Sequence, residues 1–215
     1  QRTLEASVAW SYQLLDAEAQ RMFRRLSVFA GSFPFGAAVS IGGDGGAAAE
    51  DLVLRLLRCS LLVERAGGAE PRFQMLEAVR WFARERLLES GEADAVFAAH
   101  LRWAVEVARA LGAELEAPGV RTALRGLDLE VDNLRAAMGW ALDHDRGRDV
   151  ERIVAATPWF WIWRGRIPEA DDWLDRAEHA LATDAGLDAD ADPDADPDAD
   201  PDADPGRRAE LALRW

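Results

Sequence analysis

The chain has 215 residues, of which 49% are apolar, and a formal net charge of −14. This length allows two modest domains that each bury a core. The sequence contains no run of about 18 to 20 apolar residues of the kind that crosses a membrane. We therefore expect a cytoplasmic protein with no membrane partner.

The distribution of charge argues against nucleic acid as a partner. Ten aspartates lie between Asp184 and Asp204, so the rest of the chain carries only about −4. Every basic residue apart from the three histidines is arginine, and these arginines form no basic stripe. Proteins that hold phosphates by counterion release need such a stripe, so we expect no direct DNA binding.

The first ninety residues predict several short helices. Apolar residues recur at helical spacing over residues 4–15. Asp16 can cap a second helix, which we expect Gly31 to end in a left-handed conformation. Pro34 suits the first turn of a third helix, which reaches the glycine loop at 42–46.

A fourth helix and a hairpin follow. Leu52, Val53, Leu56 and Leu57 predict a helix that leads into a strand at 61–63. Gly67 and Gly68 separate that strand from residues 72–75, a spacing typical of a β-hairpin. A further helix over 76–89 completes the order of a winged helix-turn-helix domain, which we assign to residues 1–91.

The pattern beyond residue 91 is purely helical. Four apolar stripes of helical period follow each other and are separated by short turns. Helices of about fifteen residues in antiparallel pairs are typical of TPR-like repeats, and we assign residues 92–183 to such a domain. The stripes are Phe97, Leu101, Ala104, Ala108 and Leu111; Leu127, Val131, Leu134, Met138 and Ala141; Ile153, Ala156, Phe160 and Trp163; and Trp173, Ala177 and Leu181.

Residues 184–206 alternate aspartate with alanine and proline. Like charges repel and proline withholds backbone donors, so we expect a disordered linker. A calcium site is the alternative, but the segment lacks the glycine turn and the terminal glutamate of an EF-hand loop. Residues 207–215 would begin a further repeat helix.

Several strings resemble the region that follows the nucleotide-binding domain in bacterial regulators of the NB-ARC/STAND class, notably the antibiotic-regulatory and LuxR-like groups. They span about residues 4 to 182. The strings are WSYQLL at 10–15, RRLSVFAGSF at 24–33, SLLV at 60–63, RFQMLEAVR at 72–80, ARERL at 83–87, HLR at 100–102, EVDNLRAA at 130–137, FW at 160–161, RG at 164–165 and Glu169.

The resemblance implies an upstream ATPase domain as a partner and ATP or ADP as the cofactor of the parent chain. This chain has no lysine and no phosphate-binding loop, so we expect it to hold no cofactor and to be no enzyme. Some members of the NB-ARC/STAND class have a histidine that contacts phosphate, directly after a methionine at the start of the helix that follows the hairpin. Leu76 stands at that position, after Met75, and cannot donate a hydrogen bond to phosphate.

Candidate site residues are few. Trp159, Trp161 and Trp163 point around more than one helix face, and with Arg164 and Trp173 they form a candidate partner interface. Arg55 and Arg58 are the candidate DNA contacts, but apolar neighbours favour packing.

No residues show the arrangement of a catalytic or metal site. His100, His144 and His179 show no ligand spacing with one another or with Cys59. The single cysteine cannot form an internal disulfide, and we expect it to be buried.

The leading hypothesis is a non-catalytic regulatory module. Its winged helix would hold an ATPase core closed, and its repeats would sense an unknown protein or small-molecule signal. The alternatives are a stand-alone winged-helix DNA-binding regulator and a TPR adaptor that binds a peptide.

Overall fold

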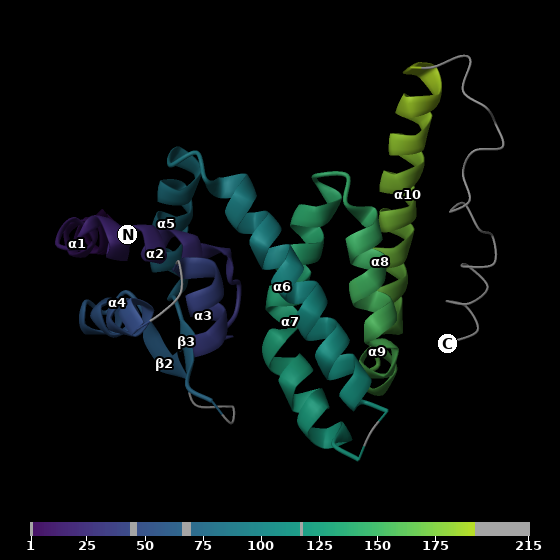
Figure 1. Ribbon diagram of the computed structural model, residues 1–215, viewed down its shortest axis with the longest axis horizontal. Helices are drawn as coiled ribbons and strands as arrows, with labels where there is room; N and C mark the ends of the chain where they lie inside the picture. The colour runs from purple at the N-terminus through teal and green to yellow at the C-terminus, as the bar shows by residue number, and fades with distance from the viewer. Residues whose placement is uncertain (1, 44–46, 66–69, 117, 192–215) are drawn as a thin grey trace. The chain divides into compact units, whose positions relative to one another are not determined.

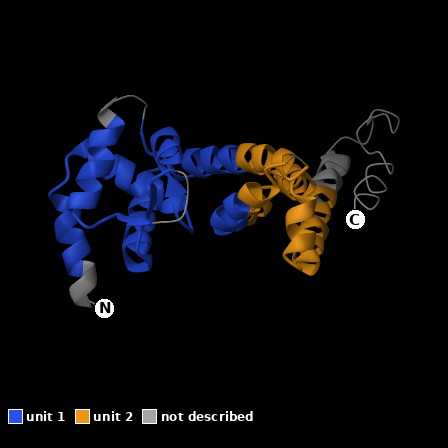
Figure 2. Cartoon of the chain, turned by 90° about the horizontal axis from the view of Figure 1, so that it is seen from below, with its two compact units in different colours: residues 1–104, 125–137 blue, residues 105–124, 138–215 orange. Residues whose placement is uncertain are grey.

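The computed structural model describes residues 2–43, 47–65, 70–116 and 118–191 and is mainly helical with one small sheet, as predicted (Figure 1). The chain divides into two compact units (Figure 2). Unit 1 comprises residues up to Ala104 together with Arg125–Ala137, and unit 2 comprises the remainder. The first unit thus includes residues on both sides of Gly91, and the domain boundary at that residue stays a prediction.

Unit 1 begins with a bundle of short helices. They are α1 (Arg2–Gln13), α2 (Ala17–Arg25), α3 (Phe35–Gly42) and α4 (Ala47–Arg58). The Oδ1 atom of Asp16 accepts a hydrogen bond from the backbone N–H of Ala19 at 3.0 Å, so Asp16 is the predicted N-cap of α2. Helix α2 packs against both α3 and α4. Its residues Met22 and Phe23 are buried, and the ring of Phe23 lies beside Tyr12 of α1 and Phe82 of α5 (Glu77–Glu89).

Helix α2 ends earlier than predicted. It stops at Arg25 and passes into a short 3-10 turn over Leu26–Val28, which also packs against α5. Gly31 is not in the left-handed region, contrary to our expectation. Its N–H instead donates a hydrogen bond to Oδ1 of Asn133 at 2.9 Å, so a contact distant in sequence shapes this loop.

The sheet has three antiparallel strands in the order β1, β3, β2. Strands β2 (Val63–Arg65) and β3 (Arg72–Gln74) form the predicted hairpin, with Glu64 opposite Phe73. Strand β1 (Phe33–Pro34) is an addition to the prediction, since two residues are too few to show a period. The expected glycine turn at 67–68 lies outside the described residues.

Helix α5 (Glu77–Glu89) follows the sheet and packs against α1, α2 and the 3-10 turn. Val79, Ala83 and Leu87 are buried on that side, as their spacing predicts. Leu76 does not join them: it is the N-cap residue and is 50% exposed. Helix α5 ends before Gly91, whose φ of +74° only glycine adopts at low cost.

Five helices follow in the part of the chain that the structure describes. They are α6 (Ala93–Glu114), α7 (Val120–Leu142), α8 (Gly147–Ala156), α9 (Pro158–Trp163) and α10 (Ile167–Ala191). Helices α6 and α7 each contribute to both units. The predicted third stripe is divided between α8 and α9, because Thr157 and Pro158 interrupt the helix. Within unit 2, α8 and α10 pack most extensively.

Helix α10 continues beyond residue 183, where we expected the helical domain to give way to a linker. It reaches Ala191 and so includes the start of the segment predicted to be a disordered linker. Alanine favours helix, and the first proline of the segment is Pro193, which disfavours helical backbone at the residue before it. The rest of the linker and the expected helix at 207–215 lie outside the described residues, as do residues 44–46 of the glycine loop.

Candidate functional site

Helix α4 directly precedes the β2–β3 hairpin. In a winged helix-turn-helix domain, the helix at this position is the recognition helix. Ala49, Val53 and Leu56 are buried on one side of α4 and fix its orientation. The opposite side carries two carboxylates, one apolar side chain and two cations. These exposed residues are Glu50, Asp51, Leu54, Arg55 and Arg58.

The candidate DNA contact Arg55 is engaged within the protein. Its Nη1 atom forms an ion pair and hydrogen bond with Oδ2 of Asp16, the N-cap of α2. The pKa of Asp16 is lowered, first by the hydrogen bond from the Ala19 N–H and then by the one from Arg55. The other exposed cation of α4, Arg58, forms no ion pair with a described residue. Helix α4 therefore presents little positive charge.

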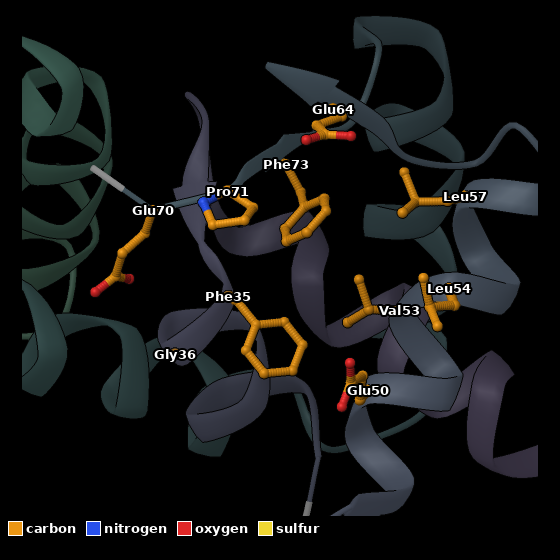
Figure 3. Close-up of a pocket in the computed structure, with 10 residues that line it drawn as sticks. All are labelled: Phe35, Gly36, Glu50, Val53, Leu54, Leu57, Glu64, Glu70, Pro71 and Phe73. Atoms are coloured by element: carbon orange, nitrogen blue, oxygen red, sulfur yellow. The ribbon is translucent and has the colours of Figure 1, made fainter. Parts of the chain in front are cut away.

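A pocket lies between α3, α4 and the hairpin (Figure 3), and we call it the wing pocket. Its volume is about 670 Å³. Six lining residues are apolar and three are glutamates, which stand on different sides of the apolar centre in Figure 3. The lining residues are Phe35, Gly36, Glu50, Val53, Leu54, Leu57, Glu64, Glu70, Pro71 and Phe73.

Among the residues that the structure describes, the lining of the wing pocket contains no cation to balance its three glutamates. Glu64 comes from β2, Glu50 from α4, and Glu70 from the segment before β3. The rings of Phe35 and Phe73 meet edge to face with centroids 6.5 Å apart in the middle of the pocket. The surface between α4 and the β2–β3 hairpin, which is the wing of the domain, is therefore both apolar and acidic.

The arginine of strand β3 faces inward. Arg72 is buried, and its Nη2 atom lies 2.7 Å from Oε1 of Glu130 on α7. Its Nε and Nη2 atoms also donate to Oγ and the carbonyl oxygen of Ser32 at 2.9 and 2.7 Å. Nδ2 of Asn133 donates to that same carbonyl and to Oε2 of Glu130, each at 2.8 Å. This network explains why part of α7 belongs to unit 1.

The network changes the electrostatics of Glu130. Burial raises the pKa of Glu130, and attraction to Arg72 with hydrogen bonds from Asn133 and Arg72 opposes that rise. A buried charged pair costs desolvation but fixes one arrangement of the groups around it. Arg72 is thus a structural residue and adds no positive charge to the surface of the wing.

A second network joins α2 to the residue before α6. Glu92 accepts a hydrogen bond from Nε of Arg24, and its Oε2 atom accepts one from Nε of Arg25 at 2.9 Å. Burial alone would raise the pKa of Glu92, but the two arginines outweigh it and lower the pKa. Two more cations of unit 1 are therefore neutralised within the protein.

His100 on α6 is fully buried among aromatic rings. Its ring lies 5.0 Å from the centroid of Phe29 and 5.5 Å from that of Trp103. Its Nε2 atom has no hydrogen-bond partner among the described residues. Burial, and then repulsion from Arg84, lowers the pKa of His100 to about 3, so this histidine is neutral at physiological pH.

The candidate tryptophans of unit 2 separate into two groups. Trp161 is fully buried and its Nε1 atom donates to Oγ1 of Thr157 at 3.1 Å. Trp173 is also buried, beneath the guanidinium of Arg176. Both are buried, which corrects their assignment to a surface: Trp161 is held by its hydrogen bond to Thr157, and Trp173 is covered by Arg176.

The other two tryptophans lie on the surface. Trp159 and Trp163 are 38% and 46% exposed, and their rings stack with centroids 5.5 Å apart, one helical turn from each other on α9. Arg164 follows them and is exposed. These three residues remain the candidate partner interface of unit 2, and Ile167 at the start of α10 adds exposed apolar area.

Unit 1 exposes further large apolar side chains that the sequence analysis did not single out. Trp10 is exposed on α1 and Leu14 in the turn just after it, and Trp81 and Leu88 are exposed on α5. Trp81, at 65%, has the largest exposed fraction of these. Their helical spacing from one another is the signal that could have indicated a second apolar face.

The remaining candidates show no reactive arrangement. Cys59 is half-buried in the turn after α4 rather than fully buried as expected. Within the described residues, no three His, Cys, Asp or Glu side chains gather closely enough to hold a metal ion. None of the described helices has the length and apolar character needed to cross a membrane.

Comparison with known proteins agrees with this geometry. Residues 15–88 match the family model described as a winged helix-turn-helix domain. Unit 1 therefore contains a winged helix-turn-helix domain built from α2 to α5 and the hairpin. No solved structure matches the chain significantly.

The relatives are much longer proteins. The chain is 33% identical over 195 residues to a protein of Mycobacterium tuberculosis that carries the name "Putative HTH-type transcriptional regulator", and equally to one of Mycobacterium bovis. These matches cover 87% of this chain and 22% of each relative. An uncharacterized protein of Mycobacterium tuberculosis is 36% identical over 121 residues, covering 51% of this chain and 30% of that protein. The chain thus spans about a fifth of the first relatives.

Proposed function

We propose that this chain is a regulatory and protein-interaction module of a transcriptional regulator, in which the winged-helix domain contacts protein rather than DNA. The observation that carries the proposal is the acidic and apolar character of the surface between α4 and the wing. The cytoplasmic location and the lack of catalytic activity that we expect from the sequence belong to the same proposal.

The electrostatic argument is direct. Duplex binding draws most of its free energy from Lys and Arg side chains that displace counterions from phosphates. On the surface of α4 and the hairpin, Glu50, Asp51 and Glu64 would repel the backbone instead. Arg55 is held by Asp16, and Arg72 is buried against Glu130. A recognition helix with this composition would bind weakly in a major groove, because its carboxylates repel the phosphates.

The finer proposal follows the resemblance to NB-ARC/STAND regulators. The winged-helix domain would pack on a nucleotide-binding domain of the parent protein and hold it in a closed, ADP-bound state. The exposed Trp81 and Leu88 on α5 support such a packing face, because large apolar side chains with no cover are typical of interaction sites. The great length of the relatives leaves room for such a domain.

Unit 2 would supply the sensor. Its stacked Trp159 and Trp163 with Arg164 have the residue types that contribute most of the free energy of protein interfaces. Binding of a protein or small-molecule signal there would shift the population of the regulator toward an open state. This unit is also the basis of the TPR-adaptor alternative, in which it binds a peptide by itself.

The test is a titration of the purified chain with duplex DNA and with ATP. We expect no sequence-selective duplex binding at 50 mM salt, because that low ionic strength favours any electrostatic contact. We also expect no ATP hydrolysis, because the chain lacks a phosphate-binding loop. Salt-dependent binding to one duplex sequence over others would overturn the first part, and turnover of ATP would overturn the second.

A stand-alone DNA-binding regulator is the second candidate. The winged helix-turn-helix match and the names of the relatives favour it. It requires Arg58 and Arg65 to contact phosphate, since both are exposed. Loss of duplex binding in an Arg58→Ala and Arg65→Ala double variant would establish it, and absence of any duplex binding by the unmodified chain would remove it.

A further inference from the structure

We infer that the wing pocket is a docking site for a basic, amphipathic helix of a partner protein. The inference deepens the proposed function and rests on it, because it names the chemistry that the winged-helix domain recognises. The evidence comes from the size, the apolar lining and the charge of the pocket.

The apolar lining is suited to side-chain anchors. A volume of about 670 Å³ accommodates several aliphatic side chains. Leu54 is exposed at the edge of the pocket, and Leu57 and Phe35 are half-buried beside it. Burial of such side chains stabilises an interface by roughly 25 cal/mol for each Å² of apolar surface removed from water. A helix that places anchors at i, i+3, i+4 and i+7 uses a groove of this kind.

The charge selects the flanking residues of the partner. Glu50, Glu64 and Glu70 surround the apolar centre from three segments (Figure 3), and the described lining residues include no cation. None of the three forms an ion pair with another residue within the described part of the chain. An amphipathic helix with Arg or Lys beside its apolar stripe can meet all three carboxylates at once.

Other occupants fit these observations less well. A small amine would satisfy one carboxylate and leave the others unpaired. A nucleic acid would bring phosphates toward three negative charges. A second copy of this chain would bring a protein with a net charge of −14. A basic helix is the class that matches both the lining and the charge.

The experiment measures binding of fluorescein-labelled peptides to the full 215-residue chain by fluorescence anisotropy at 150 mM salt. The probe peptide has sixteen residues, with Leu at i, i+3, i+4 and i+7 and Arg at the flanking positions. One control peptide has Gln in place of Arg, and a second has Ser in place of Leu. We expect the probe to bind at least about tenfold more tightly than either control.

Two matched triple variants locate the site. Glu50→Gln, Glu64→Gln and Glu70→Gln together remove the carboxylates of the wing pocket, and we expect them to weaken probe binding about tenfold. Glu18→Gln, Glu77→Gln and Glu85→Gln together remove three exposed carboxylates outside the lining and should weaken binding less than about twofold. Leu54→Gln removes one anchor without changing charge and should weaken binding several-fold. Circular dichroism verifies that each variant is folded.

Three results would overturn the inference: no binding of the probe, equal effects of the two triple variants, or equal binding of the Leu and Ser peptides. A parallel titration with duplex DNA separates this inference from the proposed function. Failure of the peptide without duplex binding refutes the pocket assignment alone. Duplex binding that Glu50→Gln, Glu64→Gln and Glu70→Gln strengthen would refute the proposed function as well. Self-association that Leu54→Gln abolishes would assign the pocket to a second copy.

Discussion

Among single residues, His100 has the clearest link between environment and stability. It is buried beside the rings of Phe29 and Trp103 and is repelled by Arg84, so it cannot take up a proton without a large loss of solvation. In the unfolded chain its pKa returns to about 6.5. The unfolded state therefore binds a proton as the pH falls below that value, whereas the folded state does not until about pH 3.

This difference predicts a loss of stability in acid that depends on His100. Between pH 7 and pH 5 the imidazole should lower the free energy of unfolding by about 2 kcal/mol. His100→Phe keeps the aromatic packing and cannot titrate. Urea unfolding at the two pH values should show that the variant loses about 2 kcal/mol less than the unmodified chain. Parallel losses in both proteins would show that His100 is solvated in the native state.

The buried pair of Arg72 and Glu130 gives a second prediction for single residues. Arg72→Met or Glu130→Met leaves one charge buried without its partner and should cost about 3 kcal/mol of unfolding free energy. The double variant removes both charges and should cost less than either single change. Urea unfolding of the four proteins measures the coupling. Simple additivity of the two losses would mean that the pair does not act as a unit.

At the scale of elements, glycines determine how closely the helices of unit 2 pack. A methyl group at Gly112 would overlap the carbonyl oxygen of Ala156, which ends α8. At Gly147, the start of α8, a methyl would lie 2.6 Å from the carbonyl oxygen of Ala177 on α10. Contacts with backbone cannot be relieved by turning a side chain, so the helices themselves would have to move apart.

Substitution of these glycines tests this packing. Gly112→Ala and Gly147→Ala should each lower the free energy of unfolding by about 1 to 3 kcal/mol. Gly139 lies within α7 and a methyl there meets no atom within 4 Å. Gly139→Ala is therefore the control and should raise stability by about 0.5 to 1 kcal/mol. Thermal unfolding provides the comparison, and stabilisation by all three changes would contradict the close packing.

At the scale of the whole molecule, the proposed function implies that charge rather than fold separates this winged helix-turn-helix domain from DNA readers. If so, Glu50→Lys, Asp51→Lys and Glu64→Lys together should confer non-specific duplex binding on the full chain. The logarithm of the binding constant should fall with the logarithm of salt concentration with a slope of about −3, one counterion for each lysine. Electrophoretic mobility shifts across a salt series measure it. If the variant does not bind duplex DNA, the shape of the domain does not fit a DNA groove.

The sequence by itself predicted most helices, the hairpin and the winged helix-turn-helix order, because these depend on local period, capping and turn residues. Asp16 shows this well: its cap of α2 needs only the next three residues. The spacing of Trp159, Trp161 and Trp163 predicted only that they occupy more than one helix face. The structure decides that Trp161 is buried against Thr157 and that Trp163, which we placed in an apolar stripe, is exposed with Trp159.

Tertiary structure alone decided the charge of the candidate surface and the division into units. The pairing of Arg55 with Asp16 and of Arg72 with Glu130 joins residues from separate segments. The wing pocket likewise gathers glutamates from a helix, a strand and a loop. No local sequence pattern predicts these contacts, because they form only when packing of the core brings the separate segments together. The same packing determines which charged side chains remain on the surface.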